Sequence, residues 1–359
     1  MTPSTPKTRI AIVAPFPPPY GGMSVLAETL SRCLGRHGFR LVHIDTNRHL
    51  SGWLGRNRLL LLLCQTVAFY VRLLKIVRCD VVLFVASSGG SFFGKIVPAA
   101  LLCRLFRKPV ILDFVGGGIE DKLADNAALW KRCFACFHEV IVPTHVFRNL
   151  FSSYGIRSVV LPHIVDIERF HHGKRDGSRH VLLAAKNLAT YSGIDSILLA
   201  YNEVRKKRTD IDLVIAGSGP ERERLDRLVT ELGLTGVTFV GNVGYADMPK
   251  LFADATIFVH GTQYESFGIV LVEAFASGTP VVSTNVGGIP EVVTDGVNGH
   301  LVPYGDYRAM AKKIEALLDS PAKYAAFRNQ AVEEARKYSC AVLAPSYVEL
   351  IETVLKGRN

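Results

Sequence analysis

The residues best suited to chemistry lie between His260 and Glu291. Two glutamates, Glu265 and Glu273, stand eight positions apart, and Phe267-Gly268 follows the first of them. A helix over 269–277 is predicted by its apolar run, and Glu273 lies just over a turn into that helix. A carboxylate among apolar neighbours is costly to bury unless it accepts hydrogen bonds. The hydroxyl groups of a ribose are suitable donors for Glu273.

The loop before this helix completes a site for a nucleotide sugar. Glu265 follows a predicted strand over 256–261, so it lies at the mouth of a sheet and can accept hydrogen bonds from a second polyol. The free N–H groups of the first helical turn, at Gly268 and Ile269, favour a diphosphate between the two glutamates. The alternative is that Glu273 is a helix-surface residue and Glu265 an ordinary loop residue.

The elements that position these residues repeat twice along the chain. The run at 9–14 reads as a buried parallel strand, and a glycine turn at Gly21-Gly22 and a helix follow it, which is the first unit of a doubly wound α/β sheet. The polar stretch HHGKRDGSRH near His171 is the best candidate for a linker, after which the pattern of strands and helices begins again. A second glycine turn, IAGSGP, contains Gly217 and Gly219; it lacks the third glycine of the dinucleotide fingerprint. Two doubly wound Rossmann-like domains in tandem are therefore expected.

The segment YESFGIVLVEAFASGTPVVSTNVGGIPE resembles the signature of family 4 of the retaining glycosyltransferases. PPPYGGMSVLAETLSRCLGRHGF, LPHIVDIERF and IAGSGPERERL resemble further parts of that family, so the likeness covers nearly the whole chain. The resemblance implies the GT-B fold, two Rossmann-like domains facing across a cleft. The expected division is an acceptor-binding domain over residues 1–172, a donor-binding domain over 173–340 and a C-terminal helix over 341–359 that packs back towards the first domain.

Residue by residue, the resemblance implies that Glu265 contacts the transferred sugar and Glu273 the ribose. The backbone from Phe267 to Ile269 is expected near the sugar and phosphates, and Gly22 is expected to approach the diphosphate from the opposite domain. The resemblance also implies retention of the anomeric configuration, through a transition state like an oxocarbenium ion, with no required metal or cofactor. The donor-binding residues expected are Gly22, Asn187, Gly217, Gly219, Val243, Glu265, Phe267, Gly268, Ile269 and Glu273.

The chain departs from the family where two cations usually grip the diphosphate. The family's Arg-Leu…Lys-Gly segment corresponds here to Asn187-Leu188…Ser192-Gly193, and Lys186, one position earlier, is the candidate to supply a cation instead. The family often has a histidine after the fourth strand of the first domain, whereas this chain has Asp113 to Gly118 there and no histidine. Asp113 is either catalytic or structural. The predicted catalytic residues are Glu265, Lys186 and Asp113.

Charge and hydropathy add predictions about partners. Residues 1–179 hold 24 Lys and Arg against 11 Asp and Glu, whereas the rest of the chain has a net charge of −3. This asymmetry suggests an anionic partner for the first half: a membrane surface, a phosphate-bearing substrate or nucleic acid. Residues 59–71 carry no charge but are too few to span a bilayer. They form either a buried helix or an interfacial helix flanked by Arg56, Arg58, Arg72, Lys75 and Arg78.

The cysteines show no spacing typical of disulfides, and Cys133 and Cys136 read as core thiols. The polar opening MTPSTPKTRI lacks a signal peptide, so a cytoplasmic protein is expected, peripheral on the inner face of the membrane if the basic half binds lipid.

The sequence thus predicts a metal-independent hexosyltransferase that uses a UDP-sugar in preference to a GDP-sugar. The expected acceptor is a lipid-linked or growing glycan in polysaccharide biosynthesis. The alternatives are a non-catalytic, nucleotide-sugar-binding or regulatory member of a glycan-assembly complex and a sugar-nucleotide epimerase. Nucleic-acid binding is not expected, because no recognisable module accompanies the positive charge.

Overall fold

The chain forms two compact units, described here from a computed structural model that covers residues 8–46, 58–171, 173 and 179–357. The first unit comprises the chain up to Ile164 together with the C-terminal residues from Cys340. The second unit is Val165–Ser339. By packing, the division thus falls at Val165 and Cys340, close to the predicted domain limits at 173 and 341.

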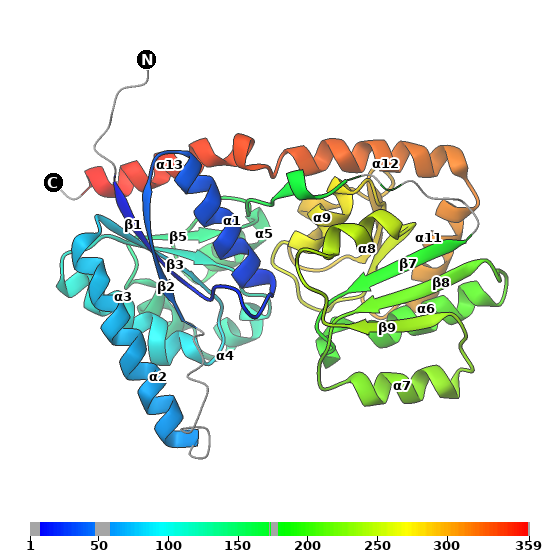
Figure 1. Cartoon of the computed structure of the whole chain (residues 1–359), viewed down its shortest axis with the longest axis horizontal. Helices are drawn as coiled ribbons and strands as arrows, with labels where there is room; N and C mark the ends of the chain where they lie inside the picture. The colour runs from blue at the N-terminus through cyan, green and yellow to red at the C-terminus, as the bar shows by residue number, and fades with distance from the viewer. Residues whose placement is uncertain (1–7, 47–57, 172, 174–178, 358–359) are drawn as a thin grey trace. The chain divides into compact units, whose positions relative to one another are not determined.

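The first unit is a six-stranded sheet in the order β2-β1-β3-β4-β5-β6, with every strand pair parallel (Figure 1). Its strands are short apolar, β-branched runs, as expected of a parallel sheet covered on both faces. Its strands are β1 (Arg9–Ala14), β2 (Arg40–Asp45), β3 (Val81–Ala86), β4 (Val110–Phe114), β5 (Glu139–Val142) and β6 (Val159–Val160). Its helices are α1 (Gly22–Arg36), α2 (Arg58–Leu73), η2 (Leu74–Arg78), η3 (Phe92–Ile96), α3 (Val97–Leu105), α4 (Ile119–Phe134), α5 (His145–Ser153) and α13 (Cys340–Lys356).

The second unit is also a six-stranded parallel sheet, in the order β12-β11-β10-β7-β8-β9. Its strands are β7 (His180–Ala185), β8 (Ile211–Ala216), β9 (Val237–Gly241), β10 (Ile257–His260), β11 (Val281–Thr284) and β12 (Gly299–Val302). Its helices are η4 (Ile167–Arg169), η5 (Thr190–Ser192), α6 (Ile194–Arg205), α7 (Arg222–Glu231), α8 (Met248–Asp254), α9 (Ile269–Ala276), α10 (Ile289–Val292), α11 (Tyr307–Leu318) and α12 (Pro321–Arg336). The sequence pattern missed β12, a short strand in which Gly299 and His300 interrupt the apolar run.

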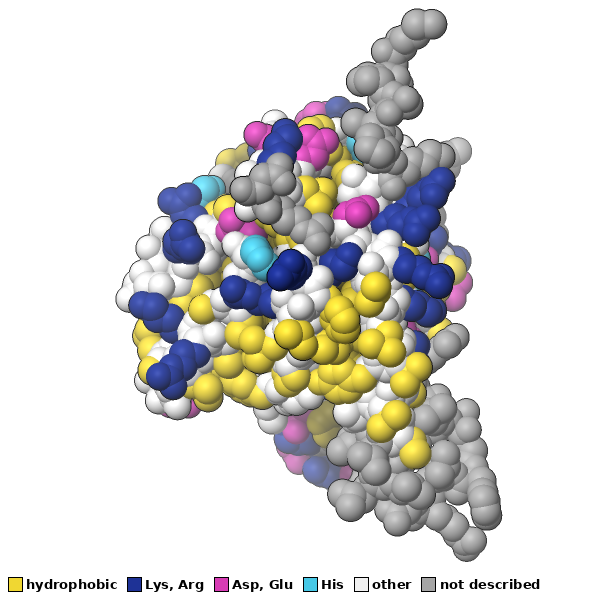
Figure 2. Space-filling view, turned by 90° about the vertical axis from the view of Figure 1, so that its left-hand side faces the viewer, with side chains coloured by type: hydrophobic (Ala, Val, Ile, Leu, Met, Phe, Trp, Pro, Cys, Tyr) yellow, Lys and Arg dark blue, Asp and Glu magenta, His cyan; other side chains and the backbone are white. Residues whose placement is uncertain are grey.

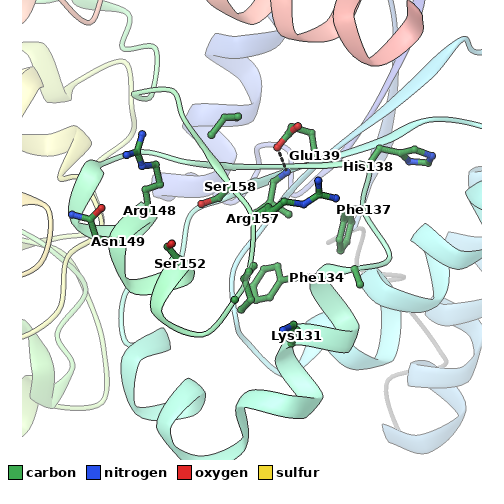
Figure 3. Close-up of a pocket in the computed structure, with 15 residues that line it drawn as sticks. Lys131, Phe134, Phe137, His138, Glu139, Arg148, Asn149, Ser152, Arg157 and Ser158 are labelled. Carbon is green, nitrogen blue, oxygen red and sulfur yellow. Dashed lines mark hydrogen bonds between the residues drawn. The ribbon is translucent and has the colours of Figure 1, made fainter. Parts of the chain in front are cut away.

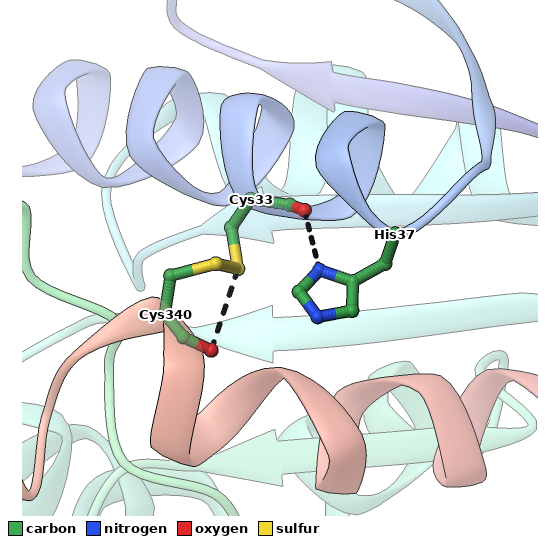
Figure 4. The surroundings of a disulfide bond; sticks show 3 residues. All are labelled: Cys33, His37 and Cys340. Carbon is green, nitrogen blue, oxygen red and sulfur yellow. Dashed lines mark hydrogen bonds between the residues drawn. A yellow bond between two sulfur atoms is a disulfide. The ribbon is translucent and has the colours of Figure 1, made fainter.

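Helix α13 is anchored to the first unit at two places. Cys340, its first residue, forms a disulfide with Cys33 of α1 (Figure 4). Further along, the hydroxyl of Tyr347 donates to the Asp113 carboxylate, 3.4 Å away, inside the unit. The disulfide corrects the expectation drawn from cysteine spacing, because partners 307 positions apart leave no local spacing to read. Cys133 and Cys136 are free thiols, the first buried and the second half-buried.

The uncharged stretch over 59–71 lies within α2. In the parts of the chain that the structure describes, no helix is both long and apolar enough to cross a membrane. Arg56 lies outside the described residues, as do the side chains of residues 58–63.

Candidate functional site

The second sheet has a topological switch point between β7 and β10, which are neighbours although they are its first and fourth strands. From this point the connections run outwards in opposite directions, so the loops after the two strands diverge. Ligands of doubly wound sheets bind in the crevice at the carboxyl ends of the strands at such a point. The loop after β7 begins at Lys186, and the loop after β10 runs from Gly261 to Gly268. These are the two loops that contain the predicted catalytic residues of this unit.

Lys186 and Glu265 meet across the switch point. The Lys186 ammonium donates to Oε2 of Glu265 at 3.0 Å and to the Thr262 hydroxyl at 2.7 Å. Nε2 of His260, the last residue of β10, lies 3.5 Å from the same carboxylate oxygen. Lys186 and Glu265 both remain about one-fifth exposed, so a ligand can reach the pair. One carboxylate, one ammonium and one imidazole therefore converge at the end of two adjacent strands.

The charges of this cluster are mutually stabilised. Burial opposes ionisation of Glu265, but the Lys186 ammonium, with help from His260, outweighs it and holds the pKa of Glu265 well below its usual range. For His260, burial and the neighbouring ammonium lower the pKa, so the imidazole is neutral at pH 7. Glu265 is thus a carboxylate at physiological pH, and an ionised carboxylate can only accept hydrogen bonds.

Backbone contacts that require glycine fix the Glu265 loop. The amide of Gly288 donates to the Glu265 carbonyl oxygen at 3.0 Å. Gly287 has a positive φ of 52°, and a β-carbon there would overlap that same oxygen. The first glycine of the Gly287-Gly288 pair is therefore explained by the close approach of one loop to another.

Glu273 occupies a different environment on α9. The helix begins after Gly268, which has a left-handed φ of 89°, and Glu273 is only 5% exposed. The pKa of Glu273 is raised to about 8, mainly by burial; a hydrogen bond with Tyr245 opposes the shift, and the Asp166 charge adds a smaller increase. Without a ligand, Glu273 is therefore mostly protonated at pH 7, and a ligand that donates hydrogen bonds to it favours its ionised form.

Three of the remaining predicted residues of the second unit form or border the loop that starts at Lys186. A β-carbon at Gly217 would overlap the Lys186 carbonyl oxygen, and one at Gly219 that of Leu188, so both glycines let the backbones approach. The Asn187 carbonyl accepts from Ser192 Oγ at 2.5 Å, which closes the turn. Three more predicted residues lie in this unit: Val243 after β9, Phe267 packed edge-on against Tyr338, and Ile269 at the start of α9.

Two predicted residues, Gly22 and Asp113, belong to the first unit. Gly22 opens α1 with open space around its α-carbon. The Asp113 side chain is completely buried, and burial raises its pKa to about 7. It lies 3.7 Å from Nδ1 of His163, and it accepts from Tyr347, a contact that holds α13 against the sheet. The structure therefore favours the structural reading of Asp113.

Sequence reasoning gave no role to His260, Thr262 or Tyr245. His260 and Thr262 lie within the segment that stood out, but nothing in their spacing indicated a contact with Glu265. Tyr245 lies far from Glu273 in the sequence, and only the fold brings the two together.

A cavity of about 800 Å³ lies elsewhere, in the first unit (Figure 3). Its lining includes Lys131 of α4, Arg148 of α5, Glu139 at the start of β5 and Arg157 before β6. It therefore opens at the amino ends of these strands, the opposite end from that used by ligands of parallel sheets. None of the predicted site residues lines it.

Comparison with known proteins agrees with the geometry of the second unit. A family model described as "Glycosyl transferases group 1" matches residues 165–337. A GDP-mannose-dependent alpha-(1-6)-phosphatidylinositol monomannoside mannosyltransferase of Mycolicibacterium smegmatis is 34% identical over 263 residues, which are 66% of this chain and 68% of the relative. A D-inositol 3-phosphate glycosyltransferase of Catenulispora acidiphila is 33% identical over 52% of this chain and 48% of the relative.

Solved structures share the fold over nearly the whole chain. A sucrose-phosphate synthase from Thermosynechococcus elongatus superposes with a TM-score of 0.80 at 19% identity, covering 98% of this chain and 100% of the other. Anabaena HepE, in complex with UDP and glucose, gives a TM-score of 0.73 at 18% identity, covering 96% and 99%. The two six-stranded parallel sheets are thus those of a GT-B fold.

Proposed function

The chain belongs to the glycosyl transferases group 1 family, the retaining glycosyltransferases of family 4, and we propose that the Lys186–Glu265 cluster is where it transfers a hexosyl group from a nucleotide sugar. The observation that carries this proposal is the convergence of Lys186 and Glu265 at the switch point of the second sheet. In this reading Glu265 accepts hydrogen bonds from hydroxyls of the transferred sugar, and Glu273 accepts them from the ribose.

Lys186 takes the place of the cations that usually hold the diphosphate. An ammonium group has three donors, and two of them are directed at Glu265 and Thr262. The third is available to a phosphate oxygen of the donor. As the bond between sugar and diphosphate breaks, negative charge grows on the leaving group and positive charge on the sugar. Lys186 stabilises the first and Glu265 the second.

The position of Lys186 argues against a non-catalytic role. That alternative depended on the replacement of the family's two cations by Asn187 and Ser192. Ser192 is neutral, and its buried hydroxyl donates to the Asn187 carbonyl. Lys186 places a cation in the same loop, beside the Glu265 carboxylate.

The proposal extends to the nucleotide base of the sugar donor and to the class of acceptor. The sequence favours a UDP-sugar, whereas the mycobacterial relative is named for GDP-mannose, so both classes have to be tried. A lipid-linked or growing glycan is proposed as the acceptor, because the first half of the chain carries a net charge of +13 and the same relative is named for a phosphatidylinositol glycoside.

The test is a panel of UDP- and GDP-sugars, with release of nucleoside diphosphate as the readout in the presence and absence of EDTA. At least one donor should be hydrolysed slowly without an acceptor. Glu265→Gln and Lys186→Met should each reduce the rate by about 100-fold, the usual loss when one charged contact to a transition state is removed. Glu231→Gln and Lys250→Met, at exposed positions of the same unit, are the matched controls.

Folded protein that neither binds nor hydrolyses any member of the panel would overturn the proposal. Full activity of Glu265→Gln would overturn the assignment of its role.

A further inference from the structure

The outer side of α2 and η2 is apolar although it faces solvent. Val67, Val71, Leu74 and Val77 are each between 50% and 61% exposed. Their spacing of three and four residues places them on one side of the helix. The opposite side packs into the core of the unit through Phe69, Leu73 and Ile76. The exposed stripe is therefore additional to what the fold needs.

A second stripe of the same kind lies on η3 and α3. Leu101 is half exposed, Leu105 is 77% exposed, and Phe93 and Phe106 are each about two-fifths exposed. Helices α2 and α3 both lie towards the left-hand side of the first unit in Figure 1, and Figure 2, which looks onto that side, shows hydrophobic side chains gathered there with Lys and Arg around them. We call the eight side chains of the two stripes the apolar face.

The segment that carries the apolar face is strongly basic. Residues 58–112 contain eight Lys and Arg and one acidic residue, Asp80. The Asp80 carboxylate accepts from the Arg9 amide at 2.8 Å, so it is already engaged. A pocket of about 320 Å³ beside the end of α3 is lined by Arg104, Arg107 and Lys108. Its charge suits a phosphate group.

We propose that the apolar face and its basic margin bind an anionic lipid bilayer. The exposed side chains would enter the boundary between headgroups and acyl chains, while the cations contact lipid phosphates. Contact surfaces between proteins are depleted in Lys at their core, and a margin of one sign would require a strongly acidic partner. The inference concerns the first unit alone and does not depend on the transfer reaction. If the proposed function is right, it also places the enzyme on the surface that holds a lipid-linked acceptor.

Arg107 supplies a direct probe of the basic margin. It is the one non-glycine residue with a positive φ (53°) among those that the structure describes. Glycine adopts this backbone conformation at no steric cost, whereas other residues pay for it. Arg107→Gly should therefore remove a charge and relieve the strain of this backbone conformation.

The experiment is flotation of the whole protein with vesicles of phosphatidylglycerol and phosphatidylcholine at low salt, and with vesicles of phosphatidylcholine alone. The protein should float with the anionic vesicles only, and added salt should release it. Arg107→Gly should weaken the apparent affinity roughly fivefold. The double variant Val71→Ser/Leu105→Ser should weaken it at least tenfold.

The matched control is Val240→Ser/Val342→Ser, which removes two exposed valines, one on β9 and one on α13. This control should float like the unchanged protein. Nucleotide-sugar hydrolysis in solution, without vesicles, should be unaffected in all three variants, which separates failure of this inference from failure of the proposed function.

Failure to float with anionic vesicles overturns the proposal. So does flotation that the two apolar-face substitutions leave unchanged. A third contrary outcome is a concentration-dependent dimer that these substitutions abolish, because it would assign the face to a second copy of the chain. Binding of soluble inorganic phosphate at Arg107 with no vesicle binding would also reject a bilayer.

Discussion

Replacing Glu273 by Gln should stabilise the ligand-free protein while weakening donor binding. Glu273 is 5% exposed, and burial raises its pKa from 4.5 to about 8. In the unfolded chain the carboxyl loses its proton near pH 4.5, but in the folded protein it keeps it until near pH 8. Between these values the unfolded state binds fewer protons, so the free energy of unfolding falls as the pH rises.

The size of the effect follows from the shift. Each pH unit between the two pKa values costs about 1.4 kcal/mol, so holding Glu273 protonated at pH 7 costs about 3 kcal/mol. Glutamine has nearly the same shape and does not titrate. Glu273→Gln should therefore match the unchanged protein near pH 4.5 and exceed it by about 3 kcal/mol at pH 7.

The assay is urea denaturation at a series of pH values, followed by far-ultraviolet circular dichroism. Tryptophan fluorescence would report on the first unit, since both tryptophans precede residue 165. Glu231→Gln, an exposed residue of α7, is the control and should show no pH-dependent gain. Affinity for the nucleoside diphosphate should fall by roughly 10- to 100-fold in Glu273→Gln, because hydrogen bonds to a charged acceptor are lost.

A Glu273→Gln variant that is less stable at every pH would refute the reasoning. So would a gain that does not grow with pH. In either case the carboxyl would not be held protonated by burial, and its availability to a ribose would need another explanation.

Two further predictions concern the backbone and the disulfide. Gly287→Ala should lower the free energy of unfolding by about 2–3 kcal/mol and weaken donor binding, because its β-carbon would displace the Glu265 carbonyl. The control is Gly296→Ala, also at positive φ but in open space, which should lower the free energy of unfolding by only about 1 kcal/mol. Equal losses in the two variants would contradict the role given to the close contact at Gly287. Cys340→Ser should lower the stability of the first unit by about 2–5 kcal/mol in non-reducing denaturation followed by tryptophan fluorescence, and adding a reductant should bring the unchanged protein to the same midpoint. Cys136→Ser, which removes a free thiol, is the control, and a midpoint of Cys340→Ser equal to that of the unchanged protein would show that the bond contributes nothing.

Local sequence patterns predicted the class of fold and a candidate for the donor half of the site. Strands such as β1 and β10 are apolar runs bounded by glycine turns, so their pattern is readable without the fold. The spacing of Glu265 and Glu273 is likewise local, since both depend on one strand, one loop and one helix. Family membership and the GT-B fold were therefore accessible from these residues, as the comparisons confirm.

The partners of these residues depend on the tertiary structure. Lys186 lies 79 positions from Glu265, and they meet because β7 and β10 are neighbours in the second sheet. The disulfide joins residues 307 positions apart for the same kind of reason. The order of strands and the packing of α13 arise from the summed burial of many side chains, which no short pattern encodes. A pattern within one segment thus predicts which residues can do chemistry, whereas the charge state and partners of those residues are set by distant segments that the fold brings to them.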